Sequence, residues 1–140
     1  MEYSDKVLEH FMNPRNVGEI PDADGIGDLS SHVCGDSIIV YIKVEDDIIK
    51  DIKFKTFGCA AAIASSSVAT EMVKGMHICE AYRITKQKIV EALGGLPEAK
   101  IHCSLMVEDG IKLAIEDYCK KRYGKTPEEY CAERSEKAEE

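Results

Sequence analysis

The chain has 140 residues, of which 44% are hydrophobic and 31% charged, and its formal net charge is −8 at pH 7. This length fits a single domain with its own hydrophobic core, and the composition excludes an intrinsically disordered chain. The acidic balance argues against a nucleic-acid-binding surface, because such surfaces need clustered lysines and arginines.

The N-terminal residues do not resemble a signal or transit peptide, and no apolar run approaches the ~18 residues that span a bilayer. We therefore expect a cytoplasmic protein that binds neither membranes nor nucleic acid. In that compartment the six cysteines are expected to stay reduced. This argues against a disulfide framework and favours metal or thiol chemistry.

The first predicted helix begins after Ser4, whose side chain can cap it, and Asn13-Pro14 ends it. The segment 15–31 is rich in glycine, proline and aspartate and lacks periodicity. It predicts an irregular connection between this helix and the elements that follow.

Two segments have the pattern of β-strands, namely Ser37 to Val44 and Ile48 to Phe57. The first is β-branched and aromatic, and the second alternates apolar and polar residues. Glu45-Asp46-Asp47 between them predicts a hairpin turn. A third and weaker strand is predicted from Leu29 to Val33.

Everything after Gly58 is predicted to be helical. The helical segments are Ala60 to Met76, a segment that Thr85 can cap, Ser104 to Tyr123, and a last helix that Thr126 and Pro127 begin. Strands followed by helices indicate an α+β fold with a small antiparallel sheet.

Residues 1–126 are expected to form one domain, and residues 127–140 an acidic helical tail of the same domain. This tail holds six acids and two bases, which give it a net charge of −4. A solvated terminal helix is the interpretation that such a charge run favours.

The six cysteines form no C-x-x-C pair, which excludes zinc ribbons, thioredoxin-type motifs and ferredoxin-type cluster loops. A metal site must therefore be assembled from distant parts of the chain. Cys119 lies on the apolar face of a predicted helix and is expected to be buried. Cys131 is expected to be an exposed bystander in the charged tail, and Cys79 is assigned a structural role.

Cys34, Cys59 and Cys103 share a different setting, because each lies at the boundary of a predicted element. Cys59 and Cys103 precede predicted helices, where unpaired N–H groups and the helix dipole favour the thiolate. Asp36 lies two residues after Cys34, and His102 directly precedes Cys103. The set suggests three thiolates with Asp36 or His102 as a fourth ligand, which suits zinc or an iron–sulfur cluster.

Sequence spacing alone leaves other interpretations of this set open. Whether the three cysteines converge depends on the fold. Asp36 is equally consistent with a turn residue, and His102 with a hydrogen-bonded structural histidine.

The motifs of this chain resemble those of the IscU/NifU-type iron–sulfur cluster assembly scaffold proteins. The resemblance covers most of the chain up to Tyr123, and the motifs keep their order along it. The matching segments are Tyr3-Ser4, Asn13 to Gly18, Cys34-Gly35-Asp36, Thr56 to Cys59, Ala62 to Ser67, His102-Cys103-Ser104 and Val107-Glu108-Asp109.

The resemblance implies a three-stranded antiparallel sheet covered by helices, with the site at one exposed end. It implies a scaffold rather than an enzyme, which receives sulfur from a cysteine desulfurase, assembles a 2Fe–2S cluster and transfers it to apo-proteins. Cys34, Cys59 and Cys103 stand at the family's ligand cysteines. Asp36 stands at its aspartate, which is associated with coordination and cluster lability, and His102 at its histidine beside the last cysteine.

The chain departs from the family's motifs at two places. Ala60-Ala61 replaces a common Gly-Ser, which alters the loop beside Cys59. Leu96 to Lys100 reads Leu-Pro-Glu-Ala-Lys where the family has the Leu-Pro-Pro-Val-Lys segment recognised by an Hsp70-type chaperone, so we expect poor binding of that chaperone.

Two other functions compete with the cluster scaffold. The alternative is a zinc-bound sulfur acceptor that stimulates a cysteine desulfurase, because the same ligands serve both metals. The zinc-bound SufU branch has a long insertion between the cysteines that correspond to Cys59 and Cys103. This chain has no such insertion, which favours the IscU-like interpretation. A purely structural zinc domain is the least favoured of the three functions, since the apolar pattern already supplies a hydrophobic core without metal. The sequence leaves the oligomeric state open, a homodimer included.

Overall fold

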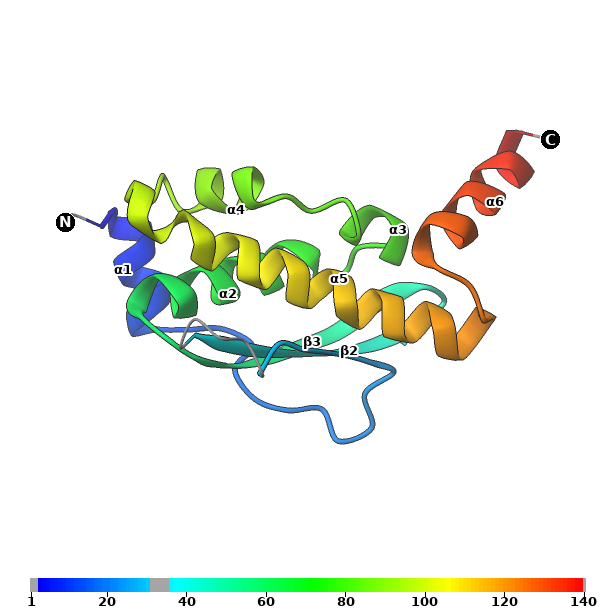
Figure 1. The fold of residues 1–140 in the computed structure, drawn as a ribbon, viewed down its shortest axis with the longest axis horizontal. Helices are drawn as coiled ribbons and strands as arrows, with labels where there is room; N and C mark the ends of the chain where they lie inside the picture. The colour runs from blue at the N-terminus through cyan, green and yellow to red at the C-terminus, as the bar shows by residue number, and fades with distance from the viewer. Residues whose placement is uncertain (1–2, 31–35, 140) are drawn as a thin grey trace.

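The computed structural model describes residues 3–30 and 36–139 (Figure 1). Its strands are β1 (Gly25–Asp28), β2 (Ser37–Glu45) and β3 (Ile48–Phe57). Its helices are α1 (Asp5–Met12), α2 (Ala60–Val73), α3 (Ile78–Ala81), α4 (Lys86–Ala92), the 3-10 helix η1 (Glu98–Lys100), α5 (Ile101–Tyr123) and α6 (Pro127–Glu139). The strands pair antiparallel in the order β1-β2-β3. The predicted α+β class with a small antiparallel sheet is confirmed.

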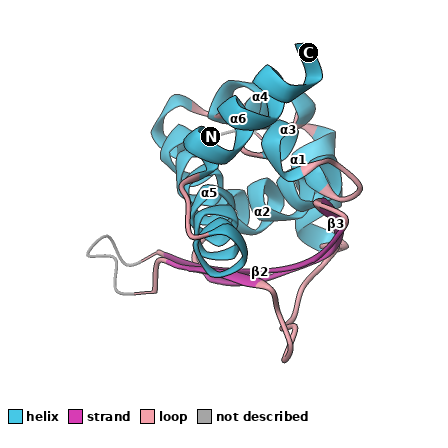
Figure 2. Ribbon diagram, turned by 90° about the vertical axis from the view of Figure 1, so that its right-hand side faces the viewer, coloured by secondary structure: helices cyan, strands magenta, loops and turns pink. Residues whose placement is uncertain are grey.

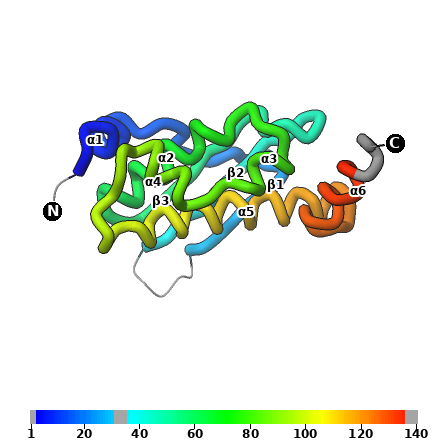
Figure 3. The backbone as a smooth tube through the Cα atoms, turned by 90° about the horizontal axis from the view of Figure 1, so that it is seen from above, coloured from blue at the N-terminus to red at the C-terminus, as the bar shows by residue number. Residues whose placement is uncertain are grey.

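The helices lie on one face of the sheet, as Figure 2 shows. Alternate residues of β2, namely Ile38, Val40 and Ile42, are fully buried on that face, and so are Ile52 and Phe54 of β3. This alternation is what a sheet covered on one side requires. The molecule is elongated along α5, and α1 and α6 lie at its opposite ends (Figure 3).

The first strand lies earlier in the chain than the sequence predicts. The prediction of a strand at Leu29 to Val33 is wrong for Leu29 and Ser30, and the rest of that range lies outside the described residues. The strand is Gly25–Asp28, within the segment expected to be irregular. A Cβ atom on Gly27 would lie 2.1 Å from the carbonyl oxygen of Gly110 in α5. Glycine is poor in strands in general, but here it lets the strand lie directly against a helix.

The hairpin between β2 and β3 is confirmed at its predicted place. Asp46 and Asp47 both have positive φ angles, 54° and 61°. Two such residues form the kind of two-residue turn whose twist matches that of the adjoining strands.

Several helix ends agree with the signals in the sequence. Ser4 caps α1 by accepting a hydrogen bond from the Val7 N–H, and Thr85 caps α4. The Thr126 hydroxyl accepts a hydrogen bond of 3.2 Å from the Glu129 N–H at the start of α6. Within the described residues, no helix has the combined length and apolar character that crossing a membrane would need.

Two helix boundaries differ from the prediction. α2 ends at Val73, before Met76, and α5 begins at Ile101, three residues ahead of Ser104. Cys103 is therefore inside the first turn of α5 and not before the helix.

Candidate metal centre

The site is formed where three elements begin at the same end of the molecule. Cys59 is the N-cap residue of α2 and directly follows the turn after β3, while Cys103 is the third residue of α5. Asp36 directly precedes β2. The pairing of Ser37 with Phe57 across β2 and β3 brings Asp36 to the chain segment that leads into Cys59.

One ligand atom each of Asp36, Cys59 and Cys103 lies within 4.8 Å of the other two. Two sulfur ligands of a tetrahedral ion, each about 2.3 Å from it, lie about 3.8 Å apart. The Sγ atoms of Cys59 and Cys103 are 3.7 Å apart. Their separation therefore suits two ligands of one tetrahedral zinc or iron ion.

The Asp36 carboxylate is held close to the backbone of Gly58. A Cβ atom on Gly58 would lie 3.0 Å from Asp36 Oδ1 and 3.1 Å from the Cβ of Ala62. A larger residue here would require the Asp36 carboxylate or the start of α2 to shift by a few tenths of an ångström. Gly58 is thus a part of the site that residue chemistry alone does not reveal.

His102 lies at the exposed rim of the site, with its Nε2 atom toward the other groups. That atom is 3.6 Å from Asp36 Oδ2 and 3.6 Å from the Sγ of Cys103. The Nδ1 atom is 3.1 Å from the carbonyl oxygen of Ala99. Because a carbonyl oxygen only accepts, Nδ1 carries the hydrogen, and a neutral ring then has its lone pair on Nε2. His102 can therefore offer a ligand atom to this site.

The expected depression of the thiol pKa is wrong for Cys103. Burial raises its pKa to about 12, and the Cys59 thiol and the Asp36 carboxylate act in the same direction. Cys103 is fully buried, and the loss of hydration penalises the thiolate more than the start of α5 favours it. A metal ion must displace the proton of Cys103 when it binds.

Cys34, the third predicted ligand thiol, lies outside the described residues. It is two residues before Asp36 in the chain. Its participation in the site remains a prediction.

The remaining cysteines divide into one confirmed and two corrected expectations. Cys119 is fully buried with a free thiol, as predicted. Cys79 and Cys131 form a disulfide, with their Cα atoms 5.8 Å apart. The expectation that all cysteines stay reduced and that Cys131 is an exposed bystander is therefore wrong. Because the two are 52 residues apart, only the packing of α6 beside α3 brings them together.

Comparison with known proteins agrees with this arrangement. The sequence profile described as NifU-like N terminal domain matches residues 2–125. The chain belongs to this NifU-like family. The match ends just before α6, and the site residues of this NifU-like chain all lie within it.

Curated relatives of this NifU-like chain carry the name of iron–sulfur cluster assembly scaffold proteins. The scaffold protein IscU 1 of Archaeoglobus fulgidus is 60% identical over 119 residues, which are 85% of this chain and 78% of the relative. The scaffold protein IscU of Escherichia coli K12 is 50% identical over 129 residues, which are 89% of this chain and all of the relative.

Solved structures share the fold at low sequence identity. A crystal structure described as a SUF-system scaffold protein from Fervidobacterium islandicum aligns with a TM-score of 0.65 at 22% identity, covering 81% of this chain and 96% of that one. The N-terminal part of a NifU-like protein from Brucella abortus also gives 0.65, at 23% identity, covering 84% and 94%. These likenesses concern the fold alone.

Proposed function

We propose that this protein is a scaffold on which a 2Fe–2S cluster is assembled and from which the cluster passes to apo-proteins. The observation that carries the proposal is the group of Asp36, Cys59 and Cys103, whose ligand atoms lie within 4.8 Å of one another. The names of the curated relatives support the same role. In this role the iron and sulfide are cargo, and the protein is not a conventional enzyme.

The proposed ligands are the thiolates of Cys34, Cys59 and Cys103 together with one exchangeable group. Thiolates are soft donors that hold iron–sulfur clusters, whereas a carboxylate is a harder donor that suits them less well. Asp36 is therefore proposed as the ligand that leaves first when an acceptor thiolate attacks the cluster. His102 can take its place, because its Nε2 atom lies 3.6 Å from both Asp36 and Cys103.

Cys59 is proposed as the thiol that receives sulfur from a cysteine desulfurase. It is half-buried, while Cys103 is fully buried. In the transfer, the Cys59 thiolate attacks the outer sulfur of the desulfurase persulfide, the S–S bond breaks, and the desulfurase thiolate leaves. Conversion of the transferred sulfur to sulfide then takes electrons from a donor outside the chain.

The surface beside the site suits contact with partner proteins. Phe57, two residues before Cys59, is 77% exposed, and Leu105, two residues after Cys103, is 38% exposed. Exposed apolar side chains close in sequence to the site cysteines are available for contact with a partner protein. We infer that the desulfurase and the apo-acceptors approach this end of the molecule.

The alternative is a zinc-bound sulfur acceptor that stimulates a desulfurase. The separation of 3.7 Å between the two sulfur atoms suits tetrahedral zinc as well as it suits iron, so this alternative rests on the same geometry. The two functions differ in the content of the loaded protein, which is iron and sulfide for the scaffold and zinc for the sulfur acceptor.

Anaerobic isolation followed by iron, zinc and acid-labile sulfide analysis, with a visible spectrum, tests the proposal. A scaffold is expected to hold iron and sulfide in equal amounts and to lose them to an apo-ferredoxin. Zinc without sulfide, unchanged by reconstitution with iron and sulfide, would favour the alternative.

A further inference from the structure

The C-terminal helix α6 lies at the end of the molecule opposite to the metal centre (Figures 1 and 3). Its first residue, Pro127, is buried and Tyr130 is half-buried, but Glu128, Glu129 and the residues 132–135 are exposed. α6 therefore contacts the body of the protein mainly through its first turn, with Pro127 and Tyr130.

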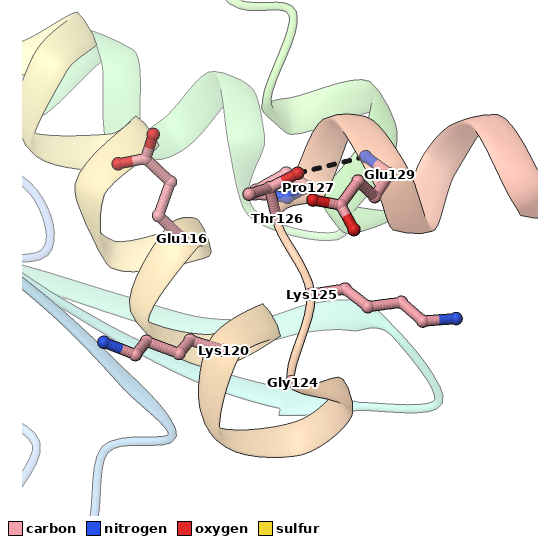
Figure 4. Close-up of a pocket in the computed structure, with 7 residues that line it drawn as sticks. All are labelled: Glu116, Lys120, Gly124, Lys125, Thr126, Pro127 and Glu129. Carbon is pink, nitrogen blue, oxygen red and sulfur yellow. Dashed lines mark hydrogen bonds between the residues drawn. The ribbon is translucent and has the colours of Figure 1, made fainter.

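A pocket open to solvent lies at the junction between α5 and α6. The pocket has a volume of about 330 Å³. Figure 4 shows residues that line it, among them Glu116 and Lys120 of α5 and Thr126, Pro127 and Glu129 at the start of α6. This pocket interrupts the surface between α5 and α6, so the contacts of individual residues beside it help to hold α6 in place.

Two groups of polar contacts hold the first turns of α6. The Tyr130 hydroxyl donates a hydrogen bond to the Asp47 carboxylate, and its ring stacks on that of Tyr123 with the centroids 4.1 Å apart. The Tyr82 hydroxyl lies 2.9 Å from a carboxylate oxygen of Glu128. The first group is half-buried and holds Tyr130 against the body of the protein, whereas the second is exposed, where such contacts contribute little.

The disulfide between Cys79 of α3 and Cys131 of α6 is the covalent attachment of this helix. Both cysteines are half-buried and line a surface cavity of about 300 Å³ together with His77, Glu80, Arg83, Arg134 and Ser135. A small molecule can therefore reach the S–S bond. Although the whole chain has a net charge of −8, this cavity presents two arginines against one glutamate.

We propose that the Cys79–Cys131 disulfide is a redox latch, meaning a bond that attaches α6 to α3 until it is reduced. A small anionic thiol that enters this cavity is the proposed reductant. The thiolate of the reductant attacks one sulfur, forms a mixed disulfide and releases the other cysteine, which takes up a proton. A second reductant thiolate then breaks the mixed disulfide. Two reductant thiols become one disulfide, and Cys79 and Cys131 gain two electrons and two protons.

Arg83 and Arg134 line this cavity, and their positive charge favours the proposed reaction in two ways. They attract carboxylate groups of the incoming thiol, and they stabilise the cysteine thiolate that leaves. The cavity thus selects for a reductant that carries negative charge.

Reduction leaves α6 attached through its first turn alone, by Pro127, Tyr130 and the hydrogen bonds of Tyr130 and Glu128. A helix of 13 residues is marginally stable in water when it is not packed against a partner. We therefore infer that the reduced form releases α6 from α3 and from the hairpin between β2 and β3. Cys103 lies at the start of α5 and α6 follows its end, and the latch is proposed without use of the proposed cluster function.

Limited trypsin digestion of the full chain tests the latch. Cleavage after Lys125, at the junction of α5 and α6, is expected to be on the order of tenfold faster in the reduced protein than in the oxidised protein. The Cys79→Ser/Cys131→Ser variant is expected to be cleaved at the faster rate under both conditions. Equal rates in the oxidised and reduced wild-type protein, or failure of the two cysteines to pair under mild oxidation, would overturn the proposal.

The rate of reduction tests the nature of the reductant. Glutathione, which is anionic, and mercaptoethanol, which is neutral, are compared on the wild-type protein and on Arg83→Gln/Arg134→Gln by counting alkylated thiols. We expect the double variant to slow reduction by glutathione about fivefold and to leave reduction by mercaptoethanol unchanged. The same slowing for both thiols, or for neither, would overturn the selection for an anionic thiol. The trypsin readout, and alkylation counted only on the peptides that contain Cys79 and Cys131, do not depend on the metal content of the protein.

Discussion

The Sγ atoms of Cys59 and Cys103 lie 3.7 Å apart, although 44 residues separate the two cysteines in the chain. α2 and α5 begin at the same end of the sheet, and each brings one of the two thiols to that end. The separation matches that of two sulfur ligands on one tetrahedral ion. The assignment of Cys59 and Cys103 as ligands can be tested with a matched control. Cys119 is also a buried free thiol, but it lies elsewhere in α5.

Substitution of either site cysteine is expected to abolish retention of the cluster. Loss of an outer-shell partner of a metal already weakens binding about 10- to 100-fold, so we expect Cys59→Ser and Cys103→Ser to lower iron and sulfide retention by at least about tenfold. Metal and sulfide analysis after reconstitution and gel filtration measures this. Cys119→Ala is the matched control, and an equal loss in that variant would contradict the assignment.

Gly58→Ala is expected to weaken metal binding even though it alters no ligand. The new methyl group would lie 3.0 Å from Asp36 Oδ1 and would displace the carboxylate. We expect a several-fold loss of affinity in a zinc titration. The loss should be smaller when Gly58→Ala is made in an Asp36→Ala background, since the carboxylate is then gone. Equal losses in both backgrounds would mean that the substitution acts through α2 instead.

Asp36→Ala is expected to slow the transfer of a cluster without preventing its assembly. Three thiolates and His102 remain, but the most weakly held ligand has been removed, so no position opens easily for an acceptor thiolate. The rate of transfer to an apo-ferredoxin, measured at equal initial loading, tests this. Rates identical to those of the wild-type protein would make Asp36 a turn residue only.

Asp47 is expected to stabilise the protein in a pH-dependent way. Burial raises its pKa, but hydrogen bonds from Tyr123, Tyr130 and Tyr118 outweigh this effect and hold the pKa below its usual value. A carboxylate with a depressed pKa in the folded state stabilises it above about pH 4, the pKa in the unfolded chain, and loses this effect as the pH falls through the folded value.

We therefore expect Asp47→Asn to lower the free energy of unfolding by about 1–3 kcal/mol at pH 7, and by less at pH 3. Denaturant unfolding at the two pH values measures the difference. Asp46→Asn is the matched control, because Asp46 is exposed in the same turn and shares the positive φ angle. A constant difference between pH 7 and pH 3 would rule out a contribution from the charge of Asp47.

The Hsp70-type chaperone is expected to bind this chain poorly. Glu98 and Ala99 occupy the places of proline and valine in the family's recognition segment, and both are exposed in η1. The variant Glu98→Pro/Ala99→Val is expected to restore binding in a calorimetric titration, with Lys125→Ala as an unrelated surface control. Strong binding by the wild-type chain would refute the expectation.

The sequence by itself determined the elements whose signals are local. The bounds of β3 and the two-residue turn at Asp46 and Asp47 follow from alternation and turn chemistry within a few residues. The caps at Ser4 and Thr85 follow in the same way, because the hydrogen bonds that they make lie within one helical turn. The candidate ligands could also be named from residue type and position at element boundaries.

Only the tertiary structure decided which of these groups meet and in what state. β1 forms at Gly25–Asp28 because Gly25 and Gly27 have no side chains, which lets the strand lie directly against α5. The strand propensities of single residues do not express such a contact. The pKa of Cys103 rises because the packing of the core removes water from its thiol, and this outweighs the local effect of the helix start. Cys79 pairs with Cys131 because α6 folds back beside α3. Each outcome depends on contacts between segments far apart in the chain, and the free energy of such contacts is fixed by packing and desolvation rather than by neighbouring residues.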